Sequence, residues 1–200
     1  SYLLEKLTAK GRETRRDIVL YVESHAEDIS NNSLSDCEIK KLQNLQSRIV
    51  IGFESKNNFV RETLYNKHLT LETFKSAVSR VRGYGLLPYA FVIAGLHPMN
   101  NTETIQDVSE SLDFLKDEGV TPVIMFTNTQ QFTLSDILLK NGTGNLLEPR
   151  TVLEILKLVI EKNPEDPESI SDSWLVADPI GGPPDPNTHI FNINTGVTCP

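Results

Sequence analysis

Short apolar runs alternate with longer amphipathic stretches along most of this chain. Four runs rich in β-branched and aromatic residues predict strands buried on both faces, at residues 18–22, 49–53, 89–94 and 122–126. Apolar residues at helical spacing predict helices around them, at residues 2–16, 33–46, 57–65, 70–83, 102–118, 133–140 and 149–162. Buried strands that alternate with helices are typical of an α/β fold with a parallel sheet and crossover helices.

Capping and stop residues predict where several of these helices begin and end. Ser35, Thr70 and Thr102 each stand before an amphipathic stretch, as an N-cap does, because their hydroxyls accept hydrogen bonds from the first turn. Gly83 and Gly85 follow one such stretch and Gly119 another, as helix stops, because glycine fits the left-handed turn that ends a helix.

The composition changes after residue 163. Seven of the eleven prolines lie in the last 37 residues, which disfavours another strand and helix there. We therefore predict two parts, an α/β body at 1–163 and an irregular proline-rich tail at 164–200 that packs on the body or covers it. The tail's apolar side chains for that contact are Ile170, Trp174, Leu175 and Val176.

Charge and hydropathy narrow the classes of partner. The 27 Asp and Glu exceed the 19 Lys and Arg, for a formal net charge of −8, which disfavours DNA binding and autonomous RNA binding through a broad basic surface. No apolar run approaches the roughly eighteen residues of a membrane span, and no signal-peptide pattern begins the chain. A cytoplasmic protein without membrane contact is the expectation.

Cysteines and histidines are few and scattered. Cys37 and Cys199 are the two cysteines, too few for a disulfide framework or a four-cysteine zinc site. None of the four histidines forms a helical i, i+4 pair, so no metal site is expected. His25 and His97 follow predicted strands, where we expect them to hydrogen-bond.

Polar residues follow each predicted strand, where the strands of a parallel sheet bring their carboxyl ends to one edge. Glu23-Ser24 comes just after the first strand and Glu54-Ser55 just after the second. Helix capping accounts for about half of such positions, but glutamate is not a usual cap residue. Neither serine lies in the G-x-S-x-G turn of serine hydrolases. Paired carboxylates at this edge suit a ligand that carries hydroxyls and an ammonium group.

These strand ends resemble those of radical S-adenosylmethionine (SAM) enzymes over about residues 17–160. The stretch RIVIGFESKNNFVRETLYNKHLT is similar to a family segment with a strand, G-[VFL]-[EQ]-[ST], a short helix, N-[KR] and a threonine-capped helix. LYVESHAEDIS and AFVIAGLHPMNNTETIQD resemble two further strand ends of the family, and FTNTQQFTLSDIL is a looser match. The subgroup that the chain resembles comprises Fe-S oxidoreductases related to the elongator catalytic subunit and to archaeosine-biosynthesis radical SAM proteins.

The resemblance implies a partial (β/α) TIM-like barrel with SAM lying across the carboxyl ends of its strands. By position, Glu23 and Ser24 match residues that contact the SAM amino group or ribose. Glu54 and Ser55 match residues that face the ribose, and Lys67 matches a basic residue that pairs with the methionyl carboxylate.

The chain departs from the family in its cysteines. Radical SAM chemistry uses a C-x3-C-x2-C loop, whose [4Fe-4S] cluster leaves one iron to chelate SAM and transfer an electron; the 200 residues contain no such loop. A cluster would therefore have to come from residues outside this chain.

Two functions follow from the resemblance. The first is the SAM-contacting portion of a radical SAM-type Fe-S oxidoreductase, inactive alone, with nucleoside or tRNA modification, and hence RNA, implied by family analogy only. The alternative is a noncatalytic binding or assembly module that keeps the half-barrel fold. In either case the open barrel edges predict self-association.

Overall fold

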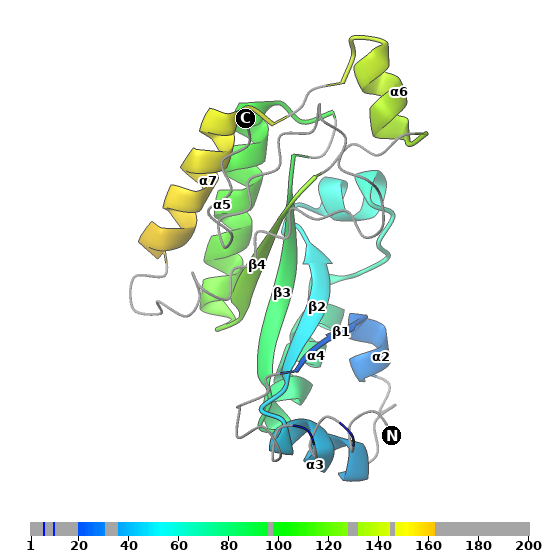
Figure 1. Ribbon diagram of the computed structural model, residues 1–200, viewed down its shortest axis with the longest axis vertical. Coiled ribbons are helices and arrows are strands. Elements are labelled where there is room, and N and C mark those ends of the chain that lie inside the picture. The colour runs from blue at the N-terminus through cyan, green and yellow to red at the C-terminus, as the bar shows by residue number, and fades with distance from the viewer. Residues whose placement is uncertain are drawn as a thin grey trace.

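The computed structural model describes residues 6, 10, 20–30, 36–95, 98–127, 132–144 and 147–162. Four parallel strands form one sheet in the order β1-β2-β3-β4, and they point the same way (Figure 1). The strands are β1 (Tyr21–Ser24), β2 (Arg48–Glu54), β3 (Leu87–Ala94) and β4 (Thr121–Phe126). This arrangement confirms the predicted α/β class with a parallel sheet.

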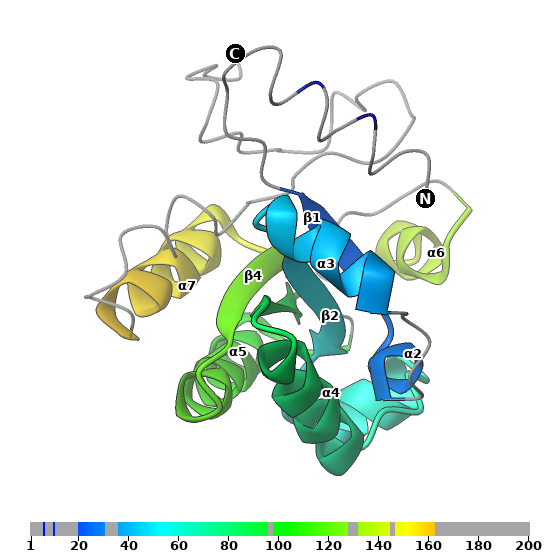
Figure 2. The ribbon, with the colours of Figure 1, turned by 90° about the horizontal axis from the view of Figure 1, so that it is seen from below.

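Helices connect the strands and cover the sheet. In chain order they are α2 (Ala26–Ser30), α3 (Asp36–Asn44), the π-helix η1 (Phe59–Leu64), α4 (Leu71–Gly83), α5 (Asn101–Asp117), α6 (Leu134–Lys140) and α7 (Pro149–Lys162). Helices α4 and α5 lie on one face of the sheet, with α7 beside α5 (Figures 1 and 2).

The hydrophobic core occupies both faces of β2. Ile51 and Phe53 point toward the helices, where the Phe53 ring stacks on Phe114 with centroids 5.4 Å apart. Val50 points to the opposite face and packs with Tyr89 of β3. This burial on both faces explains why β2 is a nearly continuous apolar run.

The structure corrects some predicted boundaries. Strand β1 covers Tyr21–Ser24, whereas the prediction placed a strand at residues 18–22, and the short helix α2 that follows it was not predicted. Thr70 caps α4 as predicted. The cap of α5 is Asn100 and not Thr102, because Asn100 forms a reciprocal capping box with Glu103 that Thr102 is too far into the helix to make.

Several predictions lie outside the described residues. They are the helix at residues 2–16, the N-cap Ser35, the role of His97, the polar segment at residues 128–131 and the whole tail at 164–200. Among the described helices, none combines the length and the apolar character that crossing a membrane requires.

Candidate functional site

The carboxyl ends of β1 and β2 bring predicted residues together. Glu54, at the end of β2, accepts a hydrogen bond from Nζ of Lys67 at 2.5 Å, and the two side chains are 9% and 21% exposed. Glu23 and His25, at the end of β1, lie close enough for their charges to act on the Glu54 carboxyl. The structure therefore places Glu23, Glu54 and Lys67 in one neighbourhood.

Burial controls the protonation of Glu54. Loss of hydration raises the pKa of its carboxyl above the ordinary value, and the negative charge of Glu23 acts in the same direction. The hydrogen bond and charge of Lys67 lower the pKa and offset part of this effect. The ion pair is thus partly buried, and a polar group that enters beside it would change the pKa of Glu54.

The backbone is unusual on both sides of the pair. Glu54 has a φ of 70°, beside a register irregularity between Gly52 and Glu54 in the pairing of β2 with β3. Asn66 and His68, the two neighbours of Lys67, have φ values of 50° and 54°. Each left-handed non-glycine residue costs about 1 kcal/mol, and such conformations concentrate at functional sites.

Gly52 provides the space that Lys67 occupies. A Cβ atom built on Gly52 would lie 2.6 Å from Nζ of Lys67 and 3.1 Å from Oε1 of Glu54. Both distances are shorter than ordinary van der Waals contact. Glycine at this strand position therefore lets the lysine cross the strand and reach the carboxylate.

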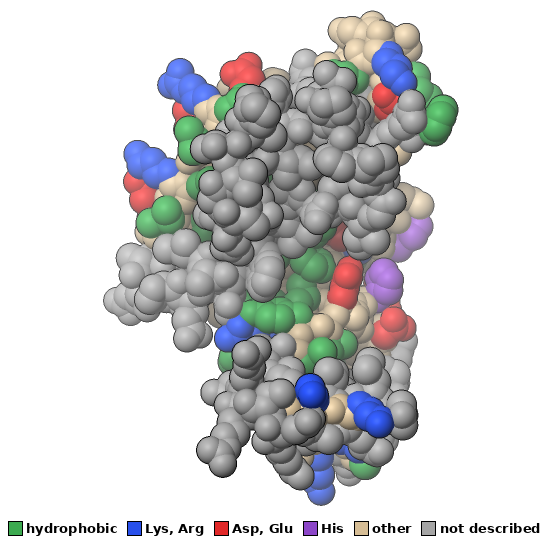
Figure 3. Space-filling view, in the orientation of Figure 1, with side chains coloured by type: hydrophobic (Ala, Val, Ile, Leu, Met, Phe, Trp, Pro, Cys, Tyr) green, Lys and Arg blue, Asp and Glu red, His purple; other side chains and the backbone are tan. Residues whose placement is uncertain are grey.

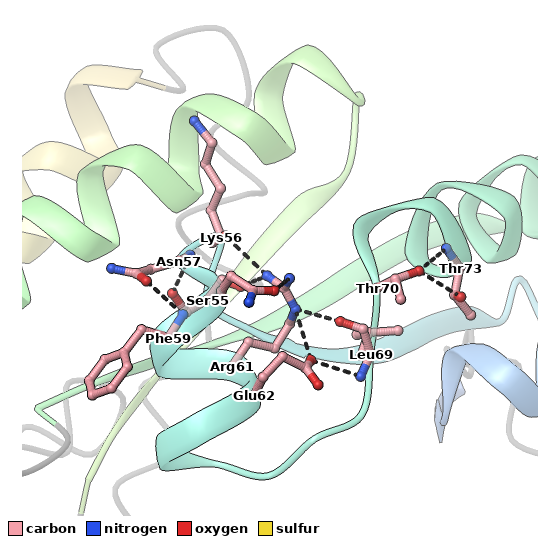
Figure 4. A network of polar contacts seen from close by, with 10 residues as sticks. Ser55, Lys56, Asn57, Phe59, Arg61, Glu62, Leu69, Thr70 and Thr73 are labelled. Carbon is pink, nitrogen blue, oxygen red and sulfur yellow. Dashed lines mark hydrogen bonds and ion pairs between the residues drawn. The ribbon is translucent and has the colours of Figure 1, made fainter.

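A buried arginine shapes the loop that joins Glu54 to Lys67 (Figure 4). Arg61 is 2% exposed and lies in η1. Its Nε donates to the Leu69 carbonyl at 2.6 Å, and its Nη1 donates to the Ser55 carbonyl at 2.9 Å. Since Ser55 follows Glu54 and Leu69 lies two residues after Lys67, the guanidinium fixes both ends of the loop.

Ser55 is engaged within the protein. It is fully buried; its Oγ donates to Oδ1 of Asp107 at 2.6 Å and accepts from the Asn57 amide at 2.9 Å. These bonds join the end of β2 to α5, and a contact between Ser55 and a ligand would require them to open. Ser24, by contrast, is half-buried, and its Oγ donates to the His25 carbonyl at 3.3 Å.

Tyr65 adds a polar group that the sequence did not single out. Its hydroxyl is buried and has no hydrogen-bond partner among the described residues. Burial raises the pKa of the phenol above its ordinary value, and the charges of Glu54 and Asp107 act in the same direction. The phenol therefore stays protonated and offers a hydrogen-bond donor near this edge.

The surface around the strand ends mixes acidic, histidine and hydrophobic side chains (Figure 3). Within the described part of the chain, no cluster of three or more His, Cys, Asp or Glu residues could hold a metal ion. Cys37 is an exposed free thiol in α3. Its helix lies at the end of the sheet opposite to Glu54 (Figure 1).

Three residues of this site were missed from the sequence, although two of them leave a trace there. Gly52 interrupts an otherwise bulky strand, a mark of close approach by another group. Asp107 lies on the buried side of α5, near Val108 and Ser111. Arg61 carries no such signal, because one basic residue in a short polar helix is ordinarily exposed.

No family model matches the chain. It is 23% identical over 179 residues to the archaeosine synthase subunit beta of Methanosarcina acetivorans, which covers 90% of this chain and 48% of the relative. The chain therefore spans about half the length of the curated relative that it matches.

Two solved structures are also similar. Coproporphyrinogen III oxidase (HemN) from Escherichia coli, a radical SAM enzyme, matches with a TM-score of 0.48 and 17% identity over 79% of this chain and 35% of its own. The radical SAM methyltransferase TsrM from Kitasatospora setae, with cobalamin and a [4Fe-4S] cluster bound, matches with a TM-score of 0.37 and 16% identity over 63% and 24%. Part of the chain is thus similar in sequence to the archaeosine synthase subunit beta, and part of it is similar in structure to these two enzymes.

Proposed function

We propose that this chain is the SAM-contacting part of a radical SAM-type Fe-S oxidoreductase that works in the cytoplasm. The observation that carries the proposal is the partly buried Glu54–Lys67 ion pair at the carboxyl edge of the sheet, beside Glu23. Ligands of open parallel α/β sheets bind at this edge. The likeness to archaeosine synthase subunit beta makes nucleoside modification the proposed reaction class, and RNA the proposed substrate.

The chemistry of these side chains fits the methionyl end of SAM. That end carries one ammonium and one carboxylate. Glu54, for which the resemblance implied a place at the ribose, and Lys67 offer the complementary charges side by side. Nζ of Lys67 has three N–H donors, of which one is directed at Glu54 among the described contacts. A zwitterion bound beside the pair would place its ammonium on the Glu54 carboxylate and its carboxylate on the Lys67 ammonium.

Glu23 and Ser24 are proposed to bind the ribose hydroxyls. Glu23 is exposed at the end of β1, and a carboxylate accepts the two hydrogen bonds that a vicinal diol donates.

When bound to a cluster in enzymes of this superfamily, SAM supplies a reactive alkyl group after one-electron reduction.

The residues of this chain do not fit the [4Fe-4S] cluster. Three thiolates must hold it, and the 200 residues contain two cysteines, of which Cys37 is in α3 away from the strand ends. We therefore assign no redox step to these residues. Binding and orientation of SAM is the proposed role, and the alternative of a noncatalytic binding or assembly module differs from it in having no need of SAM.

Calorimetric titration with S-adenosylhomocysteine tests the proposal, because this ligand keeps the zwitterion and ribose without needing a cluster. We expect binding by the wild type, and a loss of about tenfold or more in Lys67→Met and Glu54→Gln, since each removes one charge-assisted contact. Lys116→Met is the matched control, as Lys116 is an exposed lysine on α5.

Thermal unfolding of each variant distinguishes a local effect from loss of the fold. The double variant Glu54→Gln/Lys67→Met leaves no unpaired buried charge, so it should fold even where a single variant is destabilised. Absence of heat with millimolar ligand, or equal binding by the folded double variant, would contradict the proposed site.

A further inference from the structure

A cavity lies at the same edge of the sheet, and neither Glu54 nor Lys67 lines it. It measures about 360 Å³ and opens between the loops that follow β2 and β3. Phe59, Val60 and Met99 form an apolar wall, and the facing side of α5 contributes Glu103, Gln106, Asp107 and Glu110. The cavity therefore combines hydrophobic surface with three carboxylates.

No described cation neutralises these carboxylates. Glu103 accepts from the Asn100 amide in the capping box, and Glu110 accepts from Nε2 of Gln106. None of the three acids forms an ion pair with any described residue, including the nearby Lys56. Within the described part of the chain, the negative charge of the cavity is therefore uncompensated.

Asp107 gives this charge a buried component. The residue is 5% exposed and lines the cavity, and its Oδ1 is bonded to Ser55. Its Oδ2 has no hydrogen-bond partner among the described residues. Burial raises the pKa of the carboxyl, and the charge of Glu110 raises it further. A cationic donor in the cavity would bond to this second oxygen, which is not among the buried side-chain atoms that lack a partner.

The exposed ring of Phe59 favours a planar cation. Its ring is 55% exposed, which is uncommon for phenylalanine, and it lines the cavity together with the acids. An aromatic face attracts a cation, and a planar, weakly hydrated guanidinium stacks on it better than an ammonium does. The same guanidinium presents several coplanar N–H donors to carboxylates.

We propose that this cavity binds a guanidinium group on a short apolar stem, stacked on Phe59 and hydrogen-bonded to Asp107 and Glu110. The site uses none of the residues assigned to SAM, so it stands independently of that proposal. The guanidinium belongs either to a free small molecule or to an arginine side chain of a partner protein, and the two sources share this chemistry.

Titration with n-butylguanidinium, followed by NMR of the backbone amides, tests the inference. The neutral isostere n-butylurea should bind about tenfold more weakly, because it lacks the charge. Phe59→Ala and Glu110→Gln should each weaken n-butylguanidinium binding by about three- to fivefold, since both side chains are exposed. Glu72→Gln, which removes an exposed carboxylate of α4 outside the cavity, is the matched control and should bind like the wild type.

An acetylated Gly-Ala-Arg-Ala-Gly peptide and its citrulline counterpart distinguish the two sources of the guanidinium, a free small molecule and an arginine of a partner protein. Tighter binding of the arginine peptide than of n-butylguanidinium supports a partner chain, and weaker binding supports a small molecule. The inference is overturned if n-butylurea binds as well as the cation, if an arginine peptide that binds is matched by its citrulline counterpart, or if folded Phe59→Ala and Glu110→Gln bind normally.

Discussion

At the scale of single residues, Gly52 determines whether Lys67 reaches Glu54. In Gly52→Ala the new Cβ would displace the Nζ of Lys67, from which it would lie 2.6 Å. The end of a lysine side chain moves easily, so we expect a stability loss below about 1 kcal/mol. Because Lys67 lowers the pKa of Glu54, the pKa should rise further, as measured by ¹³C NMR of the carboxyl.

Gly83→Ala is the control for this substitution. Nothing lies within 4 Å of a Cβ at Gly83, at the end of α4, so the change should leave the Glu54 pKa unaltered. An unchanged Glu54 pKa in Gly52→Ala would contradict the role given to this glycine.

Arg61 should be the most costly side chain to replace in this region. Arg61→Met leaves the carbonyl groups of Ser55 and Leu69 without their donor, and we expect a loss of about 3 kcal/mol in urea unfolding. The exposed Arg150, replaced in the same way, should cost less than about 0.5 kcal/mol. Similar values for the two variants would show that the guanidinium network does not hold the loop.

Asp107 predicts a specific dependence of stability on pH. Its pKa is raised above the ordinary 3.8, so the folded state binds more protons than the unfolded state between these two values. The carboxyl therefore stabilises the fold below pH 3.8, and this contribution disappears as the pH rises through the folded pKa. Asp107→Asn still accepts from Ser55 but does not titrate, so its stability relative to the wild type should increase over this window. If the unfolding free energies of Asp107→Asn and the wild type, measured in urea, changed in parallel with pH, the raised pKa of Asp107 would be refuted.

The sequence predicted only part of the site at this scale. It identified Glu54 and Lys67, which are thirteen residues apart, because a family motif contains both. It could not predict that Ser55 would be fully buried against Asp107, since that contact joins positions 52 residues apart. Long-range partners of this kind depend on packing, which local sequence patterns do not encode.

At the scale of elements, α5 begins at a cap that the sequence misassigned. Asn100→Ala removes the side chain that accepts from the Glu103 amide, so we expect a loss of about 1 kcal/mol in thermal or urea unfolding. Thr102→Ala, at the position that the sequence suggested, should be neutral or slightly stabilising, because alanine favours helix. A larger loss of stability in Thr102→Ala than in Asn100→Ala would show that Thr102 is the cap.

Element type was easier to predict than element ends. The apolar period placed β2, β3, β4, α4, α5 and α7 within a few residues, because long periodic segments carry a strong signal. Helix α2 has five residues, too few turns to show a period, and it was not predicted, whereas η1 falls within the helix predicted at residues 57–65. Hydrogen bonds from the rest of the fold, such as those of Arg61, shape these short elements.

At the scale of the whole molecule, the parallel sheet was predictable because buried strands and helices alternate. Its order, β1-β2-β3-β4, leaves β1 and β4 at the edges of the sheet among the described strands. Self-association through open edges stays a prediction, to be measured by light scattering as a mass above that of one chain. A single-chain mass at all concentrations would contradict it.

We propose that SAM binds at the carboxyl edge of β1 and β2, and NMR of labelled side chains reports on that binding. With saturating SAM, the ¹³Cδ signal of Glu54 and the ¹⁵Nζ signal of Lys67 should shift together, while Nζ of Lys116 does not move. SAM binding that leaves the Glu54 and Lys67 signals unchanged, or no binding at millimolar SAM, would contradict the account.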